Sequence, residues 1–297
     1  MVSLPGGDDK TADAIIMLQK VYENPVSCFL LRHFTKEDKL NSALEIYSGV
    51  RKPKNMSERI DSAVIGYVVD KGAKVFGAKD RSEFVEYFQE PQPRRGLSLV
   101  LKSIAKYGVT KPQKLMAPFL IVWDFTSICN LKCKHCYASA GKKMSGELTT
   151  KQAKEVVDQL DKAGVVAIAL SGGEPLLRPD FFKIAKYIHD KGMYVSVATN
   201  GTLITKEIAR KMKEAGIEYA EISLDHPDAD KHDEFRGMKG AWDLTVQGIK
   251  NCVEAGILTA IATTITKHNY GRIPGMVDLA LKLKVDRMIA FNFIPTR

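Results

Sequence analysis

The chain has 297 residues, of which 45% are hydrophobic and 27% charged, so it is long enough for one large globular domain or two smaller ones. Its net charge of +9 is spread: residues 1–115 carry 19 basic and 14 acidic side chains, and residues 116–297 carry 25 and 21. This is not the focused basic stripe of a nucleic-acid-binding protein. No stretch reaches the roughly 18 apolar residues that span a membrane, and no signal-peptide pattern begins the chain. We therefore predict a cytoplasmic protein with no transmembrane segment and no nucleic-acid partner.

The first third of the chain has the apolar spacing of amphipathic helices. We predict a helix over 10–22, a second helix that ends at 33, and further helices over 35–48, 56–69, 80–89 and 97–107. Prolines at 91 and 93 are expected to separate the last two. No motif that carries chemistry occurs here, so residues 1–115 are predicted to form a helical N-terminal region and linker. A scaffold or cap is the simpler role, and recognition of a substrate or partner is the alternative.

Residues 116–297 form a second predicted domain, in which strands alternate with helices. Short apolar runs predict six strands, over 119–125, 165–170, 193–198, 217–224, 257–265 and 285–294. Amphipathic segments between them predict helices over 149–160, 179–190, 205–214, 242–254 and 273–283. Such alternation is typical of a parallel sheet covered by helices. The predicted fold class is therefore α/β, a partial (β/α)6 barrel preceded by the helical N-terminal region.

Three of the five cysteines lie in one short loop after the first predicted strand. Cys129, Cys133 and Cys136 have the spacing C-x3-C-x2-C, and thiolates are preferred ligands of iron–sulfur clusters. Three ligands leave one iron of a four-iron cubane open, as the metal of a catalytic site keeps an open position. A structural zinc site is the alternative, although no second C-x2-C or H-x3-H pair follows. Cys28 and Cys252 lie in apolar helical segments and are expected to be buried as small hydrophobic side chains.

Three further motifs end predicted strands. Gly172-Gly173-Glu174-Pro175 follows the second strand, Thr199-Asn200-Gly201 the third, and Ser223-Leu224-Asp225 the fourth. Glycines let a backbone approach a ligand closely, although Asn-Gly is also a common turn dipeptide. In barrels of this kind the chemistry takes place at the C-terminal ends of the strands. The motifs and the cysteine loop therefore predict a catalytic site at that edge of the sheet.

With Tyr137 directly after the last cysteine, these motifs resemble those of the radical SAM superfamily over roughly residues 116–297. The finer resemblance is to the branch that carries a C-terminal SPASM or twitch domain and modifies peptides, haem precursors or other small molecules. The resemblance implies a [4Fe–4S] cluster and S-adenosylmethionine (SAM) as cofactors. It implies an enzyme that cleaves SAM with an electron from the reduced cluster and abstracts a hydrogen atom from an organic substrate, either a peptide or a haem-type precursor. It also implies a reducing partner such as ferredoxin or flavodoxin.

The resemblance assigns roles to individual residues. Cys129, Cys133 and Cys136 correspond to the cluster ligands. Arg236 resembles the arginine that pairs with the SAM carboxylate, a task that suits a bidentate guanidinium, and a solvated loop charge is its alternative role. His135 is not needed as a ligand and is expected at the surface or behind the ligands. The residues expected to contact SAM are Tyr137, Gly172, Gly173, Glu174, Thr199, Asn200, Ser223 and Arg236.

Two other classes of protein are compatible with a cysteine loop alone. A non-catalytic iron–sulfur or zinc protein would bind metal without SAM, and it leaves Glu174 and Arg236 unexplained. An electron-transfer protein usually supplies four cluster ligands rather than three. Members of the SPASM and twitch branch continue into a cysteine-rich domain. Because no cysteine follows Cys252 here, we expect any auxiliary cluster to lie outside this sequence.

Overall fold

The computed structural model describes residues 24–35, 39–75 and 81–295. It divides into two compact units, one formed by Met1–Phe119 with Ala163–Val166 and the other by Leu120–Lys162 with Ala167–Arg297. The helix predicted over 10–22 lies outside the described residues, as does the segment 36–38 at the start of the next predicted helix. Among the described residues, no helix combines the length and the apolar character needed to cross a bilayer.

The first unit is helical around a small hydrophobic core. Leu40 and Leu44 are fully buried in that core, and Leu97 and Leu101 pack against it from the last helix. The helices are α2 (Pro25–Phe34), α3 (Lys39–Tyr47), α4 (Met56–Val75), α5 (Arg81–Tyr87) and α6 (Pro91–Tyr107).

The last helix begins earlier than predicted, at Pro91 rather than at residue 97, although α5 does end before the prolines, at Tyr87. Helix α6 begins at Pro91 and continues to Tyr107, and Glu90 precedes it in an extended conformation. The first N–H groups of a helix have no partner within the helix, so a proline there loses no hydrogen bond, and its fixed φ suits the helix. The prolines therefore begin the helix rather than interrupt it.

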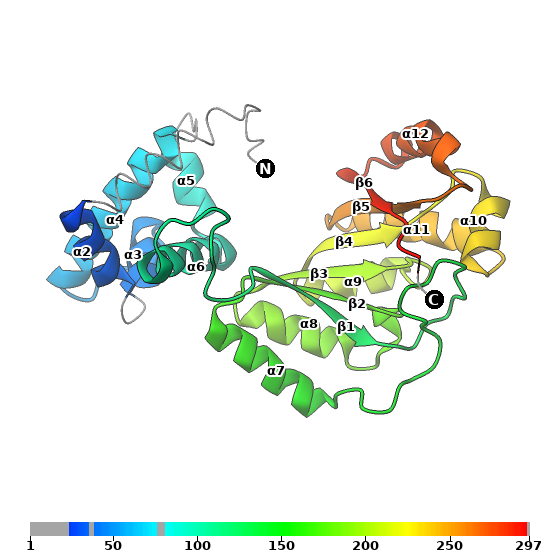
Figure 1. Cartoon of the computed structure of the whole chain (residues 1–297), viewed down its shortest axis with the longest axis horizontal. Helices are drawn as coiled ribbons and strands as arrows, with labels where there is room; N and C mark the ends of the chain where they lie inside the picture. The colour runs from blue at the N-terminus through cyan, green and yellow to red at the C-terminus, as the bar shows by residue number, and fades with distance from the viewer. Residues whose placement is uncertain (1–23, 36–38, 76–80, 296–297) are drawn as a thin grey trace. The chain divides into compact units, whose positions relative to one another are not determined.

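The second unit is built on a parallel six-stranded sheet whose strands lie in chain order from β1 to β6 (Figure 1). This order confirms the predicted α/β class with a (β/α)6 arrangement. β1 and β6 are the two edges, so the barrel is open. The strands are β1 (Leu120–Thr126), β2 (Ala167–Gly172), β3 (Tyr194–Thr199), β4 (Ile217–Ser223), β5 (Leu258–Ile265) and β6 (Arg287–Asn292).

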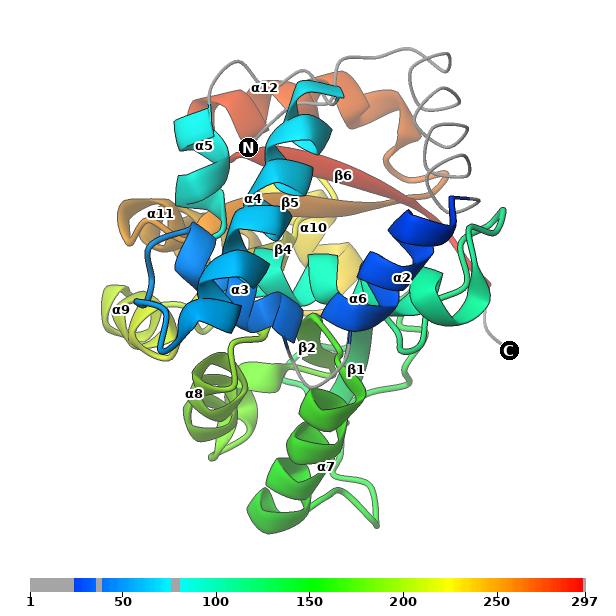
Figure 2. The same cartoon turned by 90° about the vertical axis from the view of Figure 1, so that its left-hand side faces the viewer.

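Helices cover one face of this sheet, and Figure 2 shows α8, α9 and α11 on the same side of the strands. Side chains alternate between the two faces of each strand. Val195 and Val197 of β3 and Ile222 of β4 are buried beneath the helices. We call the opposite face the inner face. The helical segments are α7 (Thr150–Ala163), η1 (Pro175–Leu177), α8 (Phe181–Asp190), α9 (Lys206–Glu214), α10 (Ala229–Arg236), α11 (Ala241–Glu254), η2 (Tyr270–Arg272) and α12 (Ile273–Leu283).

Candidate cofactor site

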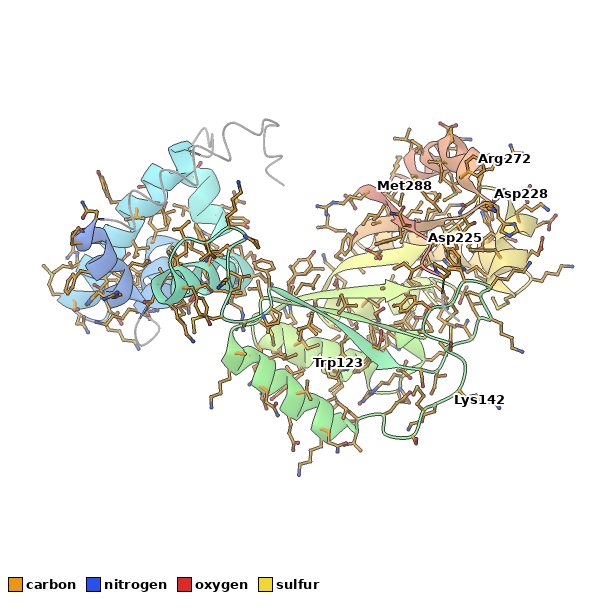
Figure 3. All side chains as sticks on the ribbon, in the orientation of Figure 1. Trp123, Lys142, Asp225, Asp228, Arg272 and Met288 are labelled. Carbon is orange, nitrogen blue, oxygen red and sulfur yellow. The ribbon has the colours of Figure 1, made fainter. Side chains whose placement is uncertain are left out.

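The residues singled out from the sequence lie at one edge of the sheet, where the strands end. The cysteine loop follows β1, while Gly172, Thr199 and Ser223 are the last residues of β2, β3 and β4. Asp225, labelled in Figure 3, lies just beyond the end of β4. Because parallel strands end at the same edge, the fold brings these motifs of distant sequence position together.

The backbone on both sides of Cys129 is fixed by residues that follow β2 and β3. On one side, the Ile128 carbonyl accepts a hydrogen bond of 2.7 Å from the N–H of Glu174. On the other side, Oδ1 of Asn130 accepts a hydrogen bond of 2.9 Å from the amide of Asn200. Cys129 therefore lies between two anchors that belong to different strand ends.

Cys133 lies against the C-terminal end of α10. The N–H groups of its two neighbours, Lys132 and Lys134, donate to the carbonyls of Arg236 at 3.2 Å and Phe235 at 3.0 Å. The guanidinium of Arg236 also lies 3.7 Å from the Cys133 sulfur. The second cysteine is thus fixed by the helix that follows β4.

Cys136 is held within the loop itself. Its N–H donates to the Cys133 carbonyl at 3.2 Å, and its sulfur accepts from the N–H of Ala140 at 3.5 Å. The next residue, Tyr137, is 61% exposed. Its ring is therefore accessible to a ligand, although the contact with adenine stays a prediction.

The two glycines after β2 are required by the chain itself. A Cβ added to Gly172 would lie 2.4 Å from the Thr126 carbonyl oxygen, and one added to Gly173 would lie 2.2 Å from that of Ile128. Gly172 also has a φ of 108°, which side chains rarely tolerate. The sequence analysis attributes these two glycines to the close approach of a ligand to the backbone. The structure adds that the backbone entering the cysteine loop packs directly on them.

Glu174 is fully buried and its carboxylate is bound by the protein. It accepts hydrogen bonds from the N–H of Leu176 at 3.2 Å, the hydroxyl of Thr199 at 2.8 Å and the N–H of Asn200 at 2.8 Å. Burial raises the pKa of Glu174, and these three bonds, which favour the carboxylate, oppose that rise. The side chain holds two strand ends together, and its expected contact with the SAM amino group stays a prediction.

Arg236 is buried rather than a solvated loop charge. Its Nε and Nη2 lie 2.7 and 2.5 Å from Oδ2 of Asp225, and the other carboxylate oxygen accepts from the N–H of Thr264 at 2.9 Å. The same guanidinium contacts Cys133. Arg236 therefore links the cysteine loop to the ends of β4 and β5.

Helix α10, which carries Arg236, was not predicted from the sequence. Asp228 caps its first turn by accepting from the N–H of Lys231 at 3.1 Å, and Gly237 ends it in the left-handed conformation. An aspartate before the helix and a glycine after it are the usual cap signals, so they could have located it.

Two histidines are desolvated beside the cysteine loop. His135 stacks on Phe235 with ring centroids 4.3 Å apart, so it lies behind the ligands rather than at the surface. His232 accepts a hydrogen bond of 3.2 Å from the N–H of Asp225 through Nδ1, which places its proton on Nε2. Burial lowers the pKa of each imidazole to about 4. Both rings are therefore neutral at pH 7.

The three thiols of the loop are suited to a cluster. Among the described residues, no three His, Cys, Asp or Glu side chains are placed to hold one metal ion. A cubane does not require that arrangement, because each thiolate binds a different iron. Burial raises the pKa of Cys129 and Cys133, and their sulfurs are close enough to Cys136 to interact with it electrostatically. Cys252 is fully buried, as expected, and the side chain of Cys28 lies outside the described residues.

An open parallel (β/α)6 sheet with a three-cysteine loop after its first strand defines a class of iron–sulfur proteins. The chain belongs to the radical SAM superfamily, whose family model matches residues 123–280, more than half of the sequence. The cofactors of this family are a [4Fe–4S] cluster and SAM, so the predicted cofactors are confirmed at the level of the family.

Similar proteins extend the family assignment. The chain is 44% identical over 181 residues to an AdoMet-dependent heme synthase of Methanosarcina barkeri, covering 61% of this chain and 52% of that protein. It is 42% identical over 176 residues to the Fe-coproporphyrin III synthase of the same organism, covering 59% and 44%. It is 36% identical over 167 residues to the mycofactocin maturase MftC of Mycobacterium tuberculosis H37Rv, covering 56% and 42%. The chain thus spans about half the length of these curated relatives.

A solved structure shares the fold. Streptococcus suis SuiB, crystallised with S-adenosylmethionine, superposes with a TM-score of 0.60 at 20% identity, covering 86% of this chain and 57% of SuiB. At this identity the likeness shows the fold alone.

Proposed function

We propose that this chain forms the catalytic core of a radical SAM enzyme that abstracts a hydrogen atom from an organic substrate. The observation that carries the proposal is the cysteine loop, in which residues that follow β2 and β3 hold both sides of Cys129 and the C-terminal end of α10 holds both neighbours of Cys133. When bound, the reduced cluster supplies the electron that cleaves SAM, and the radical derived from SAM abstracts the hydrogen. Groups that hydrogen-bond around metal ligands orient those ligands toward the metal, and the contacts on both sides of Cys129 and Cys133 would do this for the cluster.

The chain's own residues would bind and orient the cofactors. Cys129, Cys133 and Cys136 are the proposed cluster ligands. Arg236 is fixed by its ion pair with Asp225, so its charge has one orientation from which to hold the SAM carboxylate. The proposed SAM-binding surface consists of Tyr137, Gly172, Gly173, Glu174, Thr199, Asn200, Ser223 and Arg236.

Within that surface, Ser223 and Glu174 differ in what their side chains can do. The hydroxyl of Ser223 is partly exposed and has no hydrogen-bond partner among the described residues, so it is free to meet the ligand. Glu174 is saturated by its three protein donors and would act by keeping the ends of β2 and β3 together.

A tetrapyrrole is the substrate we favour. Proteins named for the synthesis of haem, Fe-coproporphyrin III and pre-haem d1 match the chain at 44%, 42% and 36% identity. A peptide is the second candidate, because the maturase MftC matches at 36% and SuiB has been crystallised with its precursor peptide. An electron donor such as ferredoxin or flavodoxin is a proposed partner. The cytoplasm is the proposed location, because free thiols require a reducing compartment.

The test is production of 5′-deoxyadenosine by the reconstituted, reduced protein in the absence of substrate. We expect turnover of SAM by the wild-type protein and by Cys252→Ser, whose thiol lies within α11, and none by Cys133→Ser. The proposal fails if the wild-type protein carries a full cluster and releases no 5′-deoxyadenosine.

A further inference from the structure

The loop that carries the three thiols is basic. Residues 129–146 contain four lysines and no aspartate or glutamate, whereas the whole chain has 44 basic and 35 acidic side chains. All four side chains are exposed, and two of them flank Cys133. The four are Lys132, Lys134, Lys142 and Lys143. The proposed cluster ligands therefore lie in a segment of concentrated positive charge.

The part of the loop after the cysteines is folded back on the part before them. The N–H of Gly141 donates to the Ser127 carbonyl at 2.8 Å, and the Ser127 hydroxyl donates to the Lys142 carbonyl at 2.8 Å. The N–H of Met144 donates to the same hydroxyl at 2.8 Å. Figure 3 shows Lys142 on this returning segment. The lysines before and after the last cysteine thus belong to one closed loop.

The turn after α10 adds a further lysine to the loop. A Cβ on Gly237 would lie 2.6 Å from the Lys132 carbonyl oxygen, so this turn packs directly on the loop. Lys239, two residues later, is exposed. We call the five exposed side chains the lysine surface, which consists of Lys132, Lys134, Lys142, Lys143 and Lys239.

Three members of the lysine surface have no acidic partner. Among the residues that the structure describes, Lys132, Lys142 and Lys239 make no ion pair. Lys134 pairs with Glu234 at 2.7 Å, but the two side chains are 51% and 59% exposed, and such a pair contributes little free energy. By contrast, lysine–carboxylate pairs one helical turn apart neutralise parts of α8 and α9. The lysine surface therefore keeps a positive charge that an acidic partner can meet.

A hollow with lysines at its edge adjoins the lysine surface. Its volume is about 440 Å³, and Lys134, Lys231 and Lys267 are among the residues that line it. Two carboxylates line it as well. Glu234 is shared by Lys134 and Lys231, at 2.7 and 4.0 Å, and Asp225 is neutralised by its ion pair with the guanidinium of α10. The hollow is therefore suited to an acidic side chain of a docked protein.

The place of the lysine surface favours one kind of anionic partner. Electron transfer between proteins requires the two redox centres to approach each other closely, so a donor must bind near the cluster ligands. A nucleic-acid interface would need basic charge along a longer stripe. Opposite charges steer short-lived redox complexes together, and the interfaces of such complexes are small. Met144, 65% exposed in the same loop, offers an apolar contact, and methionine is enriched at protein interfaces.

We propose that the lysine surface is the docking site of an acidic electron-transfer protein of the flavodoxin or ferredoxin kind, which reduces the cluster. The inference rests on the proposed function, because it names where the donor for that reaction binds. In the complex the reduced donor loses one electron and the cluster gains it, with no proton or group transferred. The proposal assigns a task to five lysines that bind no cofactor.

Donor binding can be measured without catalysis. The dissociation constants of an oxidised flavodoxin and of an oxidised ferredoxin, both acidic, are measured by calorimetric titration of the reconstituted full chain. The test variant is Lys132→Glu/Lys142→Glu. The control variant, Lys183→Glu/Lys250→Glu, changes the net charge equally at exposed lysines of α8 and α11, helices that cover the sheet opposite its inner face. All proteins are compared at equal iron content.

We expect the test variant to bind the donor at least about tenfold more weakly than the wild-type protein at low salt, and the control variant to bind it equally well. Binding by the wild-type protein should weaken as salt screens the charges. Lys132→Gln/Lys142→Gln removes the charges without reversing them and should give an intermediate loss. Equal dissociation constants for the test and control variants, or a wild-type protein that binds a DNA duplex and neither donor, would overturn the inference.

The rate of cluster reduction gives an independent readout. It is followed as the loss of the cluster's visible absorbance after mixing with the reduced donor protein, or with reduced methyl viologen, a small cation that gains nothing from a basic surface. We expect the test variant to slow reduction by the donor protein and not by the viologen. Equal slowing with both reductants would overturn the inference, because the substitutions would then act on the cluster rather than on docking.

Failure of the inference and failure of the proposed function give different results. A wild-type protein that cleaves SAM when reduced by viologen but binds neither donor contradicts the inference alone. A wild-type protein that is reduced and does not cleave SAM contradicts the proposed function, whatever the donors show.

Discussion

Asn130 and Asn200 are 70 positions apart in the sequence, yet the amide of Asn200 donates to Oδ1 of Asn130 at 2.9 Å. Asn130 in turn donates to the hydroxyl of Thr202 at 2.8 Å, and that hydroxyl donates to Oδ1 of Asn200 at 2.6 Å. This ring of three side chains ties the residue after Cys129 to the end of β3. The first cysteine is therefore positioned by a strand that contributes no ligand of its own.

Replacing Asn130 by alanine should loosen the cluster without removing a ligand. Loss of groups that orient metal ligands typically costs 10- to 100-fold in metal affinity, so we expect iron release to a chelator to accelerate by about tenfold. Asn292→Ala, at the end of β6, is the matched control and should release iron at the wild-type rate. Identical release from Asn130→Ala and the wild-type protein would show that the ring does not support the cluster.

Gly173→Ala should disturb the same loop by a steric route. The new Cβ would lie 2.2 Å from the carbonyl oxygen of Ile128, so the backbone entering the loop must move. We expect a loss of stability of about 1–3 kcal/mol in chemical denaturation and a reduced iron content after reconstitution. Gly271→Ala meets no atom within 4 Å and should leave both quantities unchanged. A fully loaded, equally stable Gly173→Ala protein would contradict the packing described for this turn.

Glu174→Gln tests whether the buried carboxylate acts as an acceptor for three donors. The substitution turns one oxygen into an NH2 group that faces N–H and O–H donors, which should cost about 1–3 kcal/mol of stability. Glu221→Gln is the control, because that carboxylate has no partner among the described residues, and we expect little change. The measurement is the denaturation midpoint of each variant. Equal midpoints for both variants would argue against the network around Glu174.

The burial of His232 is expected to make the free energy of unfolding depend on pH. Burial lowers its pKa to about 4, and Arg236 and His226 favour the neutral ring while Asp225 and Asp233 oppose them. In the unfolded chain the ring binds a proton near pH 6.5, and in the folded chain only near pH 4. The free energy of unfolding should therefore fall as pH drops from 6.5 to 4, by about 3 kcal/mol from this group.

Denaturation of the protein before reconstitution, at several pH values, measures this dependence. His232→Asn can still accept from the N–H of Asp225 but cannot titrate, so its stability should fall less over the same range. His135 has a similar pKa shift and is present in both proteins, so the difference between the two curves reports His232. Curves of equal slope would contradict the assignment.

The repeating part of the fold could be predicted from the sequence because its signals are local. Apolar runs and glycine ends located the six strands, and the parallel order then placed every motif at one edge. Helix α10 was missed because it is charged along most of its length and offers no apolar stripe, only Phe235 near its end. A proline between two helical segments can end the first or begin the second, so the local pattern at Pro91 does not locate the start of α6.

The contacts inside the site could not be predicted from the sequence. The bond between Asn130 and Asn200 and the pairing of Arg236 with Asp225 depend on which strand ends meet, and local patterns do not contain that information. The unpartnered state of Glu221 is also a property of the assembled sheet. The spacing of the motifs in the sequence identifies which residues are candidates for cofactor binding. The folded structure shows which of those side chains are fixed by hydrogen bonds or ion pairs within the protein.

The central claim is that the cysteine loop binds a four-iron cluster with one iron open to SAM. Anaerobic reconstitution followed by electron paramagnetic resonance of the reduced protein, with and without SAM, tests it most directly. We predict a cubane signal that changes when SAM is added. A cubane signal that is indifferent to SAM, or a protein that takes up zinc and shows no iron signal, would contradict the account.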